Sequence, residues 1–87
     1  MKTFQLKISS PEGDVFNGEV VKISVRGTEG DLAVMAGHIP FVSAVKPCDC
    51  KIEFDSGEEK IGHTDGGILT VSNDVVLLLS GNFVWKD

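Results

Sequence analysis

Basic residues are scarce in this chain of 87 residues. Eight lysines and arginines stand against thirteen aspartates and glutamates, which gives a formal net charge of −5. The basic residues do not gather in any one segment of the sequence. Because nucleic-acid-binding proteins need a basic face to neutralise phosphates, this charge balance argues against nucleic acid as a partner. It argues equally against direct docking on anionic lipid.

Long hydrophobic runs are missing as well. The run at residues 75–79 is five residues long and no unbroken apolar run exceeds it, so none can cross a bilayer. Polar and apolar residues alternate from the N-terminus onward, without the apolar core of a signal peptide. We therefore expect a cytoplasmic protein with no direct membrane insertion, in which Cys48 and Cys50 are reduced.

No segment has sustained helical periodicity, and apolar residues alternate with polar ones instead. The clearest alternation covers residues 48–54, where Cys48, Cys50, Ile52 and Phe54 share one face. Period-two alternation is typical of half-buried strands. Further strands are expected at residues 4–8, 15–16, 20–25, 32–35, 41–45, 59–63, 68–71, 75–79 and 83–85.

Turn residues separate these segments at intervals of roughly eight to twelve residues. Asn17-Gly18 is the strongest hairpin signal in the chain, and Val21, Ile23 and Val25 are expected on one face of the strand that follows it. Nine or ten short strands at this spacing predict an all-β fold, an antiparallel sandwich or barrel. A chain of this length supports one core, so residues 1–87 are expected to form one domain.

Glycine is concentrated in residues 27–40, where Gly27, Gly30 and Gly37 flank a short apolar run. Glycine at such offsets indicates a positive φ or a close backbone approach, and the residue before Pro40 is biased toward an extended conformation. The segment therefore predicts a turn, a short strand and a second turn. Because it contains no nucleophile–base pair and no phosphate-binding pattern, it indicates a shaped surface rather than a reactive site.

Two cysteines and two histidines are the residues that suggest a metal site. Structural zinc needs four N or S ligands, usually from C-x2–4-C pairs. Cys48 and Cys50 instead place two sulfurs about 7 Å apart on the core-facing side of a strand, which suits neither zinc nor a disulfide. His38 and His63 are the additional ligand candidates. We therefore expect no metal site.

The alternative role for His38 is that of a catalytic base. No serine or cysteine stands near it in an activating pattern, so a hydrogen bond to local backbone is the preferred interpretation. Acidic pairs such as Glu58-Glu59 are too sparse for a calcium loop, and Gly66-Gly67 is not followed by the Lys-Ser/Thr of a phosphate loop. The residues indicate a small binding or structural module without catalytic or cofactor-binding residues.

Several short motifs follow one another through nearly the whole chain. The strongest are Gly27-Thr28-Glu29-Gly30-Asp31-Leu32 and Gly37-His38-Ile39-Pro40. The weaker ones are FQLKI at residues 4–8, SPEG at 10–13, VFNGEV at 15–20, VKP at 45–47, GGILTV at 66–71 and VVLLL at 75–79. In this order and spacing, the chain resembles the N-terminal β-sandwich domain of the epsilon subunit of rotary F-type ATP synthase (delta in mitochondria).

The resemblance implies a flattened, ten-stranded β-sandwich in the central stalk, or rotor, of a proton- or sodium-translocating ATP synthase. In this family the domain packs on the gamma subunit and the c-ring and couples ion-driven rotation to ATP synthesis, while other subunits perform the catalysis. The implied location is peripheral, on the cytoplasmic face of the cell membrane.

The resemblance also implies which residues face the c-ring. They are Thr28, Glu29, Gly30, Asp31, Gly37 and His38. The two turns that carry them are expected at the same end of the sandwich, with Glu29 and Asp31 pairing with basic residues of the ring. The gamma-facing surface is expected to be more apolar.

The chain departs from the family pattern at a few positions. Cys48 stands where the family usually has glycine, and Arg26 and Ala36 stand where proline is frequent. The family commonly continues into a C-terminal helical hairpin, so helix-based self-inhibition is expected to be absent if 87 residues is the native length, and a trimmed chain is the alternative. An apolar patch without its partner favours weak self-association. Two alternatives stay open, a metal-binding sandwich that uses Cys48, Cys50 and a histidine, and a small hydrolase that uses His38.

Overall fold

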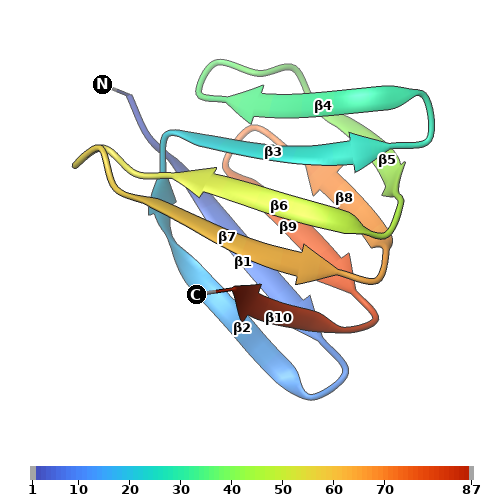
Figure 1. Ribbon diagram of the computed structural model, residues 1–87. Helices are drawn as coiled ribbons and strands as arrows, with labels where there is room; N and C mark the ends of the chain where they lie inside the picture. Colours follow the sequence, from blue (N-terminus) through green and yellow to red (C-terminus); the bar gives the residue numbers. More distant parts are fainter. Residues whose placement is uncertain (1, 87) are drawn as a thin grey trace.

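Ten β-strands make up the protein, and the computed structural model describes residues 2–86 (Figure 1). The strands are β1 (Phe4–Ser10), β2 (Gly13–Val20), β3 (Lys22–Gly27), β4 (Gly30–Met35), β5 (Phe41–Val45), β6 (Cys48–Glu53), β7 (Glu59–Thr64), β8 (Gly67–Val71), β9 (Val75–Ser80) and β10 (Phe83–Lys86). The predicted all-β fold class is confirmed. Residues 2–86 contain no helix long and apolar enough to cross a membrane.

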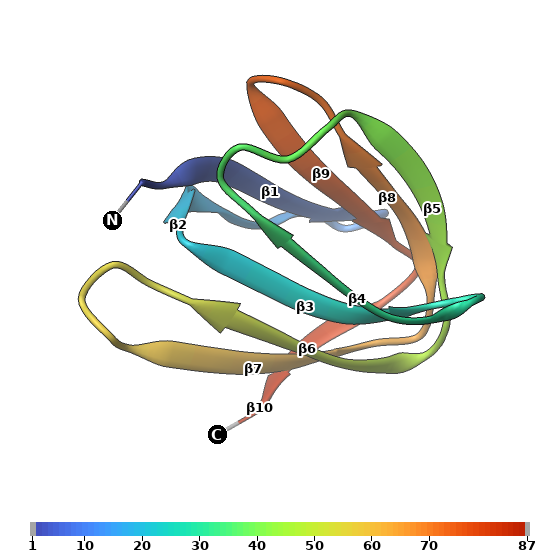
Figure 2. The same ribbon diagram turned by 90° about the horizontal axis from the view of Figure 1, so that it is seen from above.

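The strands form one hydrogen-bonded sheet that folds over on itself. Their order is β10-β7-β6-β3-β5-β8-β9-β1-β2, and β4 pairs with β3. The pair Gly27–Val45 is the one ladder position that β3 shares with β5, so the sheet bends there into two layers. The first layer holds β10, β7, β6, β3 and β4, and the second holds β5, β8, β9, β1 and β2. Figure 2 shows β1, β8 and β9 on one side of β3, β6 and β7.

One pairing in the sheet is parallel, which the predicted antiparallel arrangement did not include. β1 and β9 run in the same direction, with Gln5 opposite Val75 and Ser9 opposite Leu79. The remaining ladders are antiparallel. Hairpin-connected strands must be antiparallel, but β1 and β9 are far apart in the sequence, so no tight turn fixes their relative direction.

The predicted hairpin at Asn17-Gly18 is wrong. Both residues lie inside β2, where they pair with Lys7 and Leu6 of β1. The chain turns earlier, at residues 11–12, and Gly13 after the turn has a φ of 127°. An Asn-Gly pair favours a hairpin only when the flanking strands can meet across it, and the earlier turn had already set the β1–β2 register.

Val21 also departs from the expected pattern. It lies between β2 and β3 rather than inside a strand, and its backbone N–H donates to the carbonyl of Glu53 at 2.8 Å. Val20 and Ile23 are both fully buried. Because Val21 interrupts the alternation, Val20 and Ile23 can both face the core although they are an odd number of residues apart.

The core lies between the two layers. Each strand contributes its inward-facing residues, such as Leu6 and Ile8 of β1, which are fully buried. As predicted, Cys50 and Ile52 are also fully buried, and Cys48 packs partly buried against the same cluster. Burial of one large aliphatic side chain stabilises a fold by roughly 1.5–3 kcal/mol, so this alternation is the main source of stability.

Aromatic side chains cover the open edge between β2 and β10, the two ends of the strand order. Phe16 of β2 packs edge-to-face on Trp85 of β10 at a centroid distance of 6.0 Å and on Phe54 at 5.9 Å. Trp85 in turn packs on Phe83 at 5.0 Å. Such pairs contribute about 0.5–1.5 kcal/mol beyond the area they bury, so side chains hold the two edges together in place of a ladder.

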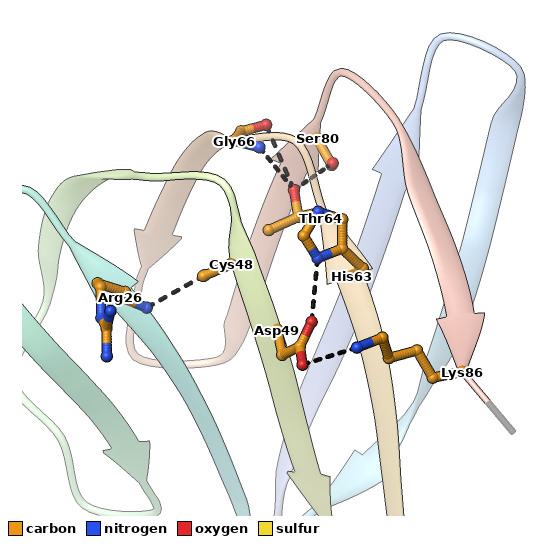
Figure 3. Close-up of polar contacts among 8 residues, drawn as sticks. All are labelled: Arg26, Cys48, Asp49, His63, Thr64, Gly66, Ser80 and Lys86. Carbon is orange, nitrogen blue, oxygen red and sulfur yellow. Dashed lines mark hydrogen bonds and ion pairs between the residues drawn. The ribbon is translucent and has the colours of Figure 1, made fainter.

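At one corner the chain crosses between the layers three times, from β5 to β6, from β7 to β8 and from β9 to β10. Hydrogen bonds join the last two of these crossings. The buried hydroxyls of Thr64 and Ser80 are 2.5 Å apart. Thr64 Oγ1 also accepts the backbone N–H of Gly66 at 3.1 Å, as Figure 3 shows. Asp65 Oδ1 accepts the backbone N–H of Asn82 at 2.8 Å. These hydrogen bonds tie the two crossings to each other.

Gly67 provides the first prediction, because two backbones come closest at this corner. A Cβ atom at Gly67 would lie 1.9 Å from the carbonyl oxygen of Leu79. Gly67→Ala is therefore expected to lower the free energy of unfolding by about 3 kcal/mol or more, since a backbone atom must move. Gly18→Ala is the matched control, because its Cβ would meet only the ring of Phe16, at 3.2 Å.

Urea unfolding of the two variants measures the difference. Gly18→Ala is expected to shift the free energy of unfolding by less than about 1 kcal/mol. Equal midpoints for the two variants would contradict the close approach at Gly67.

Candidate interaction surfaces

The β3–β4 turn is short and exposed. Gly30 has a φ of 128°, a conformation that favours glycine, and Thr28 and Glu29 at the tip are exposed. Arg26 Nε lies 3.1 Å from Asp31 Oδ1, so Asp31 already forms an ion pair within the hairpin. Glu29 forms no ion pair or side-chain hydrogen bond with residues 2–86. Its carboxylate is the negative charge that this turn offers to a partner.

The expectation that Gly37 and His38 lie at the same end as this turn is wrong. β4 runs between the two turns, and its six residues span roughly 17 Å at about 3.4 Å per residue. Figure 1 shows the β3–β4 turn and the β4–β5 loop at opposite ends of β4. The sequence showed two glycine turns around a short strand, and an extended strand necessarily places its flanking turns at opposite ends.

His38 lies in the β4–β5 loop and joins it to the β8–β9 turn. Its Nδ1 is 2.7 Å from the carbonyl oxygen of Met35, and its Nε2 is 2.9 Å from the carbonyl oxygen of Ser72. Phe4 packs against the imidazole edge at a centroid distance of 5.6 Å. The predicted hydrogen bond to local backbone is confirmed. With both nitrogens placed on carbonyl oxygens, this imidazole is poorly placed to take a proton from a substrate.

The two cysteines and His63 lie on opposite faces of the first layer. Cys48 accepts the backbone N–H of Arg26 at 3.3 Å, on the inner side. On the outer side, Asp49 lies 3.0 Å from His63 Nδ1 and 3.0 Å from Lys86 Nζ (Figure 3). The hydrogen bond from His63, followed by that from Lys86, lowers the pKa of the Asp49 carboxyl. His63 therefore cannot join the cysteines around one metal ion.

Residues 2–86 contain no group of three or more histidine, cysteine, aspartate or glutamate side chains placed to hold a metal ion. Both cysteines are free thiols. Burial raises the pKa of Cys50 to about 12, and the adjacent Cys48 thiol adds to the rise. A four-ligand zinc site is therefore not available within the described part of the chain.

The outer face of the first layer is covered by charge pairs. Lys22 lies 3.9 Å from Glu53, and Lys51 lies 3.3 Å from Glu59. Together with the Asp49 cluster, these pairs run across β3, β6, β7 and β10. Exposed pairs stabilise a fold little, and Ile61 and Val84 lie among them on the same face, 41% and 55% exposed.

The outer face of the second layer is apolar over β5, β8 and β9, whereas β1 and β2 carry the Lys7–Asp14 ion pair. Val42, Ile68 and Leu79 are 67%, 48% and 48% exposed. The ladder places Ile68 between Ala44 of β5 and Leu79 of β9, while Leu77 lies in the next row opposite Thr70. We call these residues of β5, β8 and β9 the apolar outer face: Val42, Ala44, Ile68, Leu77 and Leu79. A contiguous exposed apolar surface on a small protein marks a site of protein contact.

Sequence reasoning expected an apolar partner surface but did not identify its residues. The sequence did indicate such a surface at residues 75–79, where the residues on both faces of the strand are apolar. A strand with one solvated face should alternate, so a strand that is apolar on both sides is covered on both sides. Val76 and Leu78 fill the core, which leaves Leu77 and Leu79 for the outer surface.

His38→Ala is expected to lower the free energy of unfolding by about 1–3 kcal/mol, because the variant loses the imidazole N–H donor to a backbone carbonyl and the contact with Phe4. A loss of this size lowers the melting temperature by several degrees in a domain of this length. The control is His63→Ala, which removes an exposed pair and should change stability by less than about 0.5 kcal/mol. Thermal unfolding at neutral pH compares the two, and equal losses would contradict the role given to His38.

Comparison with solved structures identifies the same fold in two assemblies. A chain in the cryo-EM structure of the Euglena gracilis mitochondrial ATP synthase (OSCP, F1 and c-ring) superimposes with a TM-score of 0.90 at 24% identity, covering 95% of this chain and 53% of that one. A chain in the Tetrahymena thermophila mitochondrial ATP synthase central stalk and c-ring gives 0.78 at 15% identity, covering 94% and 66%. The chain thus spans about half to two thirds of the length of these neighbours.

The family comparison is more specific than the structural likeness. The model of the ATP synthase delta/epsilon chain β-sandwich domain matches residues 3–86. The match covers every strand of the sandwich. The resemblance that the motifs indicated is therefore confirmed, and the chain belongs to the family of the ATP synthase delta/epsilon chain β-sandwich domain.

Proposed function

We propose that this domain is a non-catalytic part of the central stalk of an F-type ATP synthase. It packs on the gamma subunit and on the c-ring, and it couples ion-driven rotation of the ring to ATP synthesis. Its location is peripheral, on the cytoplasmic face of the cell membrane, as part of the synthase. The observation that carries the proposal is the family match over residues 3–86, on a fold with one apolar and one charge-paired outer face.

The apolar outer face is the proposed gamma-binding surface. Ile68 and Leu79 are half exposed and adjacent across the β8–β9 ladder. Burial of such side chains against a partner contributes roughly 25 cal/mol per Å² of apolar area. The charge pairs on the other layer would have to be desolvated in a protein contact, which is costly. The two outer faces are therefore unequal in their capacity to bind protein.

The β3–β4 turn is the proposed c-ring contact. Thr28, Glu29, Gly30 and Asp31 lie at the tip of a hairpin that β3 and β4 hold rigidly. Glu29 supplies the negative charge, while Asp31 shares its carboxylate with Arg26. Gly37 and His38 belong to the opposite end of the sandwich and are not included in this contact. A charge at a contact rim contributes mainly to register and to the rate of association.

The side chains of the described residues support a role without bond chemistry. His38 contacts backbone carbonyls and His63 contacts Asp49. Within residues 2–86 neither histidine is hydrogen-bonded to a serine, threonine or cysteine side chain. Nucleophilic catalysis needs such a pair, so the hydrolase alternative has no support in this arrangement.

Affinity purification of tagged protein from gently solubilised host membranes tests the proposal directly. Recovery of gamma, alpha, beta and c subunits in fixed proportion is the expected result. Recovery of the domain alone, under conditions that keep the synthase intact, would contradict the stalk role.

Ile68→Glu with Leu79→Glu is expected to weaken binding to the isolated gamma subunit by at least about tenfold, because a buried unpaired charge is costly. The matched control is Ile61→Glu with Val84→Glu, which places the same charges at exposed positions on the other layer, 41% and 55% accessible. Binding of the control pair should stay within about twofold of wild type. Isothermal titration calorimetry compares the two variants, and an equal loss of affinity for the gamma subunit would contradict the assignment of this surface.

Glu29→Lys is expected to reduce ATP-driven ion pumping in reconstituted membranes while leaving the fold and gamma binding intact. The reversed charge opposes basic residues of the ring, and the effect should shrink as salt is raised. Glu58→Lys, in the β6–β7 turn at the other end of the sandwich, is the control. Normal pumping by Glu29→Lys, or an equal defect in Glu58→Lys, would contradict the placement of the turn.

A further inference from the structure

Cys48 and Cys50 are the chemical feature of this chain that its proposed function does not use. They stand two residues apart on the inner face of β6, and both are free thiols. Cys50 is fully buried and Cys48 is half-buried. Asp49, the residue between them, points to the outer face, so the two cysteines follow one another along the same side of the strand.

The strand spacing decides what these two sulfurs can do together. Two Cβ atoms on one face of a strand are roughly 7 Å apart, whereas a disulfide needs about 3.8 Å. A metal ion between two sulfurs relaxes this requirement, because two metal–sulfur bonds of about 2.3 Å each span about 4.6 Å when they are in line. The spacing that excludes a disulfide therefore suits a linear sulfur–metal–sulfur bridge.

We propose that Cys48 and Cys50 form a two-coordinate site for a soft monovalent metal ion such as Cu(I). Soft thiolate ligands select Cu(I) among the common biological metals, and a d10 monovalent ion is satisfied by two ligands in line. The absence of a third ligand in residues 2–86, which excludes tetrahedral zinc, therefore does not exclude this ion. With two cysteines as its ligands, the bound ion has a coordination number of two.

The surroundings of the two cysteines suit such a site. Cys50 faces Gly62 across the β6–β7 ladder, and Cys48 faces Thr64. The hydroxyl of Thr64 is already engaged by Ser80 and by the corner backbone. No side chain on β7 therefore competes for the ion, and no water-filled space surrounds Cys50, whose exposed fraction is zero.

The ion would reach the site through Cys48. This residue lines an open surface depression together with Val25, Arg26 and Pro47. The backbone N–H of Arg26 points at Cys48 Sγ at 3.3 Å, as Figure 3 shows. An N–H donor of this kind stabilises the negative charge that a metal-bound thiolate carries. Cys48 is then the entrance ligand and Cys50 the interior one.

Binding displaces two protons. Each thiol loses its S–H proton to solvent as its sulfur bonds to the metal, so one Cu(I) and two thiols give a bridge with a net charge of −1 and two released protons. No electron is transferred, and no co-reactant is needed. An ion held by a single cysteine would release one proton instead.

Cu(I) competition tests the proposal on the purified chain. The protein is titrated anaerobically into Cu(I) held by the chromophoric chelator bicinchoninate, and proton release is followed in weak buffer. The expected result is one Cu(I) per chain and two protons per ion. Failure to withdraw Cu(I), release of one proton per ion, or one Cu(I) shared by two chains in native mass spectrometry would each overturn the intrachain site.

Variants assign the ligands. Cys48→Ser and Cys50→Ala are each expected to lower the affinity for Cu(I) at least a hundredfold, while Asp49→Asn, which changes the residue between them on the outer face, stays within threefold of wild type. Circular dichroism checks that each variant is folded. If Cys50→Ala does not fold, the half-buried Cys48→Ser decides, and unchanged affinity in that variant would refute the proposal. Because the assay uses the chain alone, its outcome is separate from that of the gamma-binding experiments.

Discussion

The corner where the chain crosses between the two layers at β5–β6, β7–β8 and β9–β10 is the constraint on which the rest of the sandwich depends. Gly67 permits the backbone of β8 to pass next to the carbonyl of Leu79, where a Cβ would be 1.9 Å away. Thr64 and Ser80 bury a hydroxyl pair between the crossings. Buried polar groups are tolerated only when each is hydrogen-bonded, and here each hydroxyl has a partner. The corner fixes the second layer relative to the first, and hence what each outer face presents.

The two outer faces of the domain differ in the side chains that they expose. On the first layer, cross-strand charges satisfy one another, as between Lys51 and Glu59. On the second layer, Ile68 and Leu79 lie side by side and about half of each residue is exposed to water. The same ten strands therefore provide one face rich in charge pairs and one with a cluster of exposed aliphatic side chains. The turn between β3 and β4 lies beside the β5 edge of the apolar face, because Thr28 and Glu29 line the same surface depression as Val42.

The alternation of polar and apolar residues was enough to predict most of the strands. Each strand buries one face and exposes the other to water, so the pattern can be read within a single segment. The strand over residues 41–45 and the parity of Cys50 and Ile52 are examples. The prediction at Asn17-Gly18 was wrong because two turn signals stand close together, and the pairing of β1 with β2 shows that the chain turns at the earlier one. The parallel β1–β9 ladder likewise depends on residues about seventy positions apart.

The candidate surfaces were less predictable than the fold. Glu29 could be recognised as an exposed acid in a glycine turn, but its separation from His38 follows from strand geometry in three dimensions. The apolar outer face draws residues from the β8–β9 hairpin and from β5, which ends more than twenty residues before β8 begins. Only the sheet order brings them together. Motif order did indicate the family, since the family match covers residues 3–86.

The parallel pairing of β1 with β9 has a consequence for the order in which this protein can be made. β1 is the first strand to be synthesised, yet one of its edges stays unpaired until residues 75–80 are available. The β1–β2 hairpin can form early, but a two-stranded hairpin is at best marginally stable in water. Closure of so long a loop costs entropy before any contact repays it. The domain therefore completes its sheet only when nearly the whole chain is present, so a stalled or shortened chain leaves an open strand edge where other chains can pair.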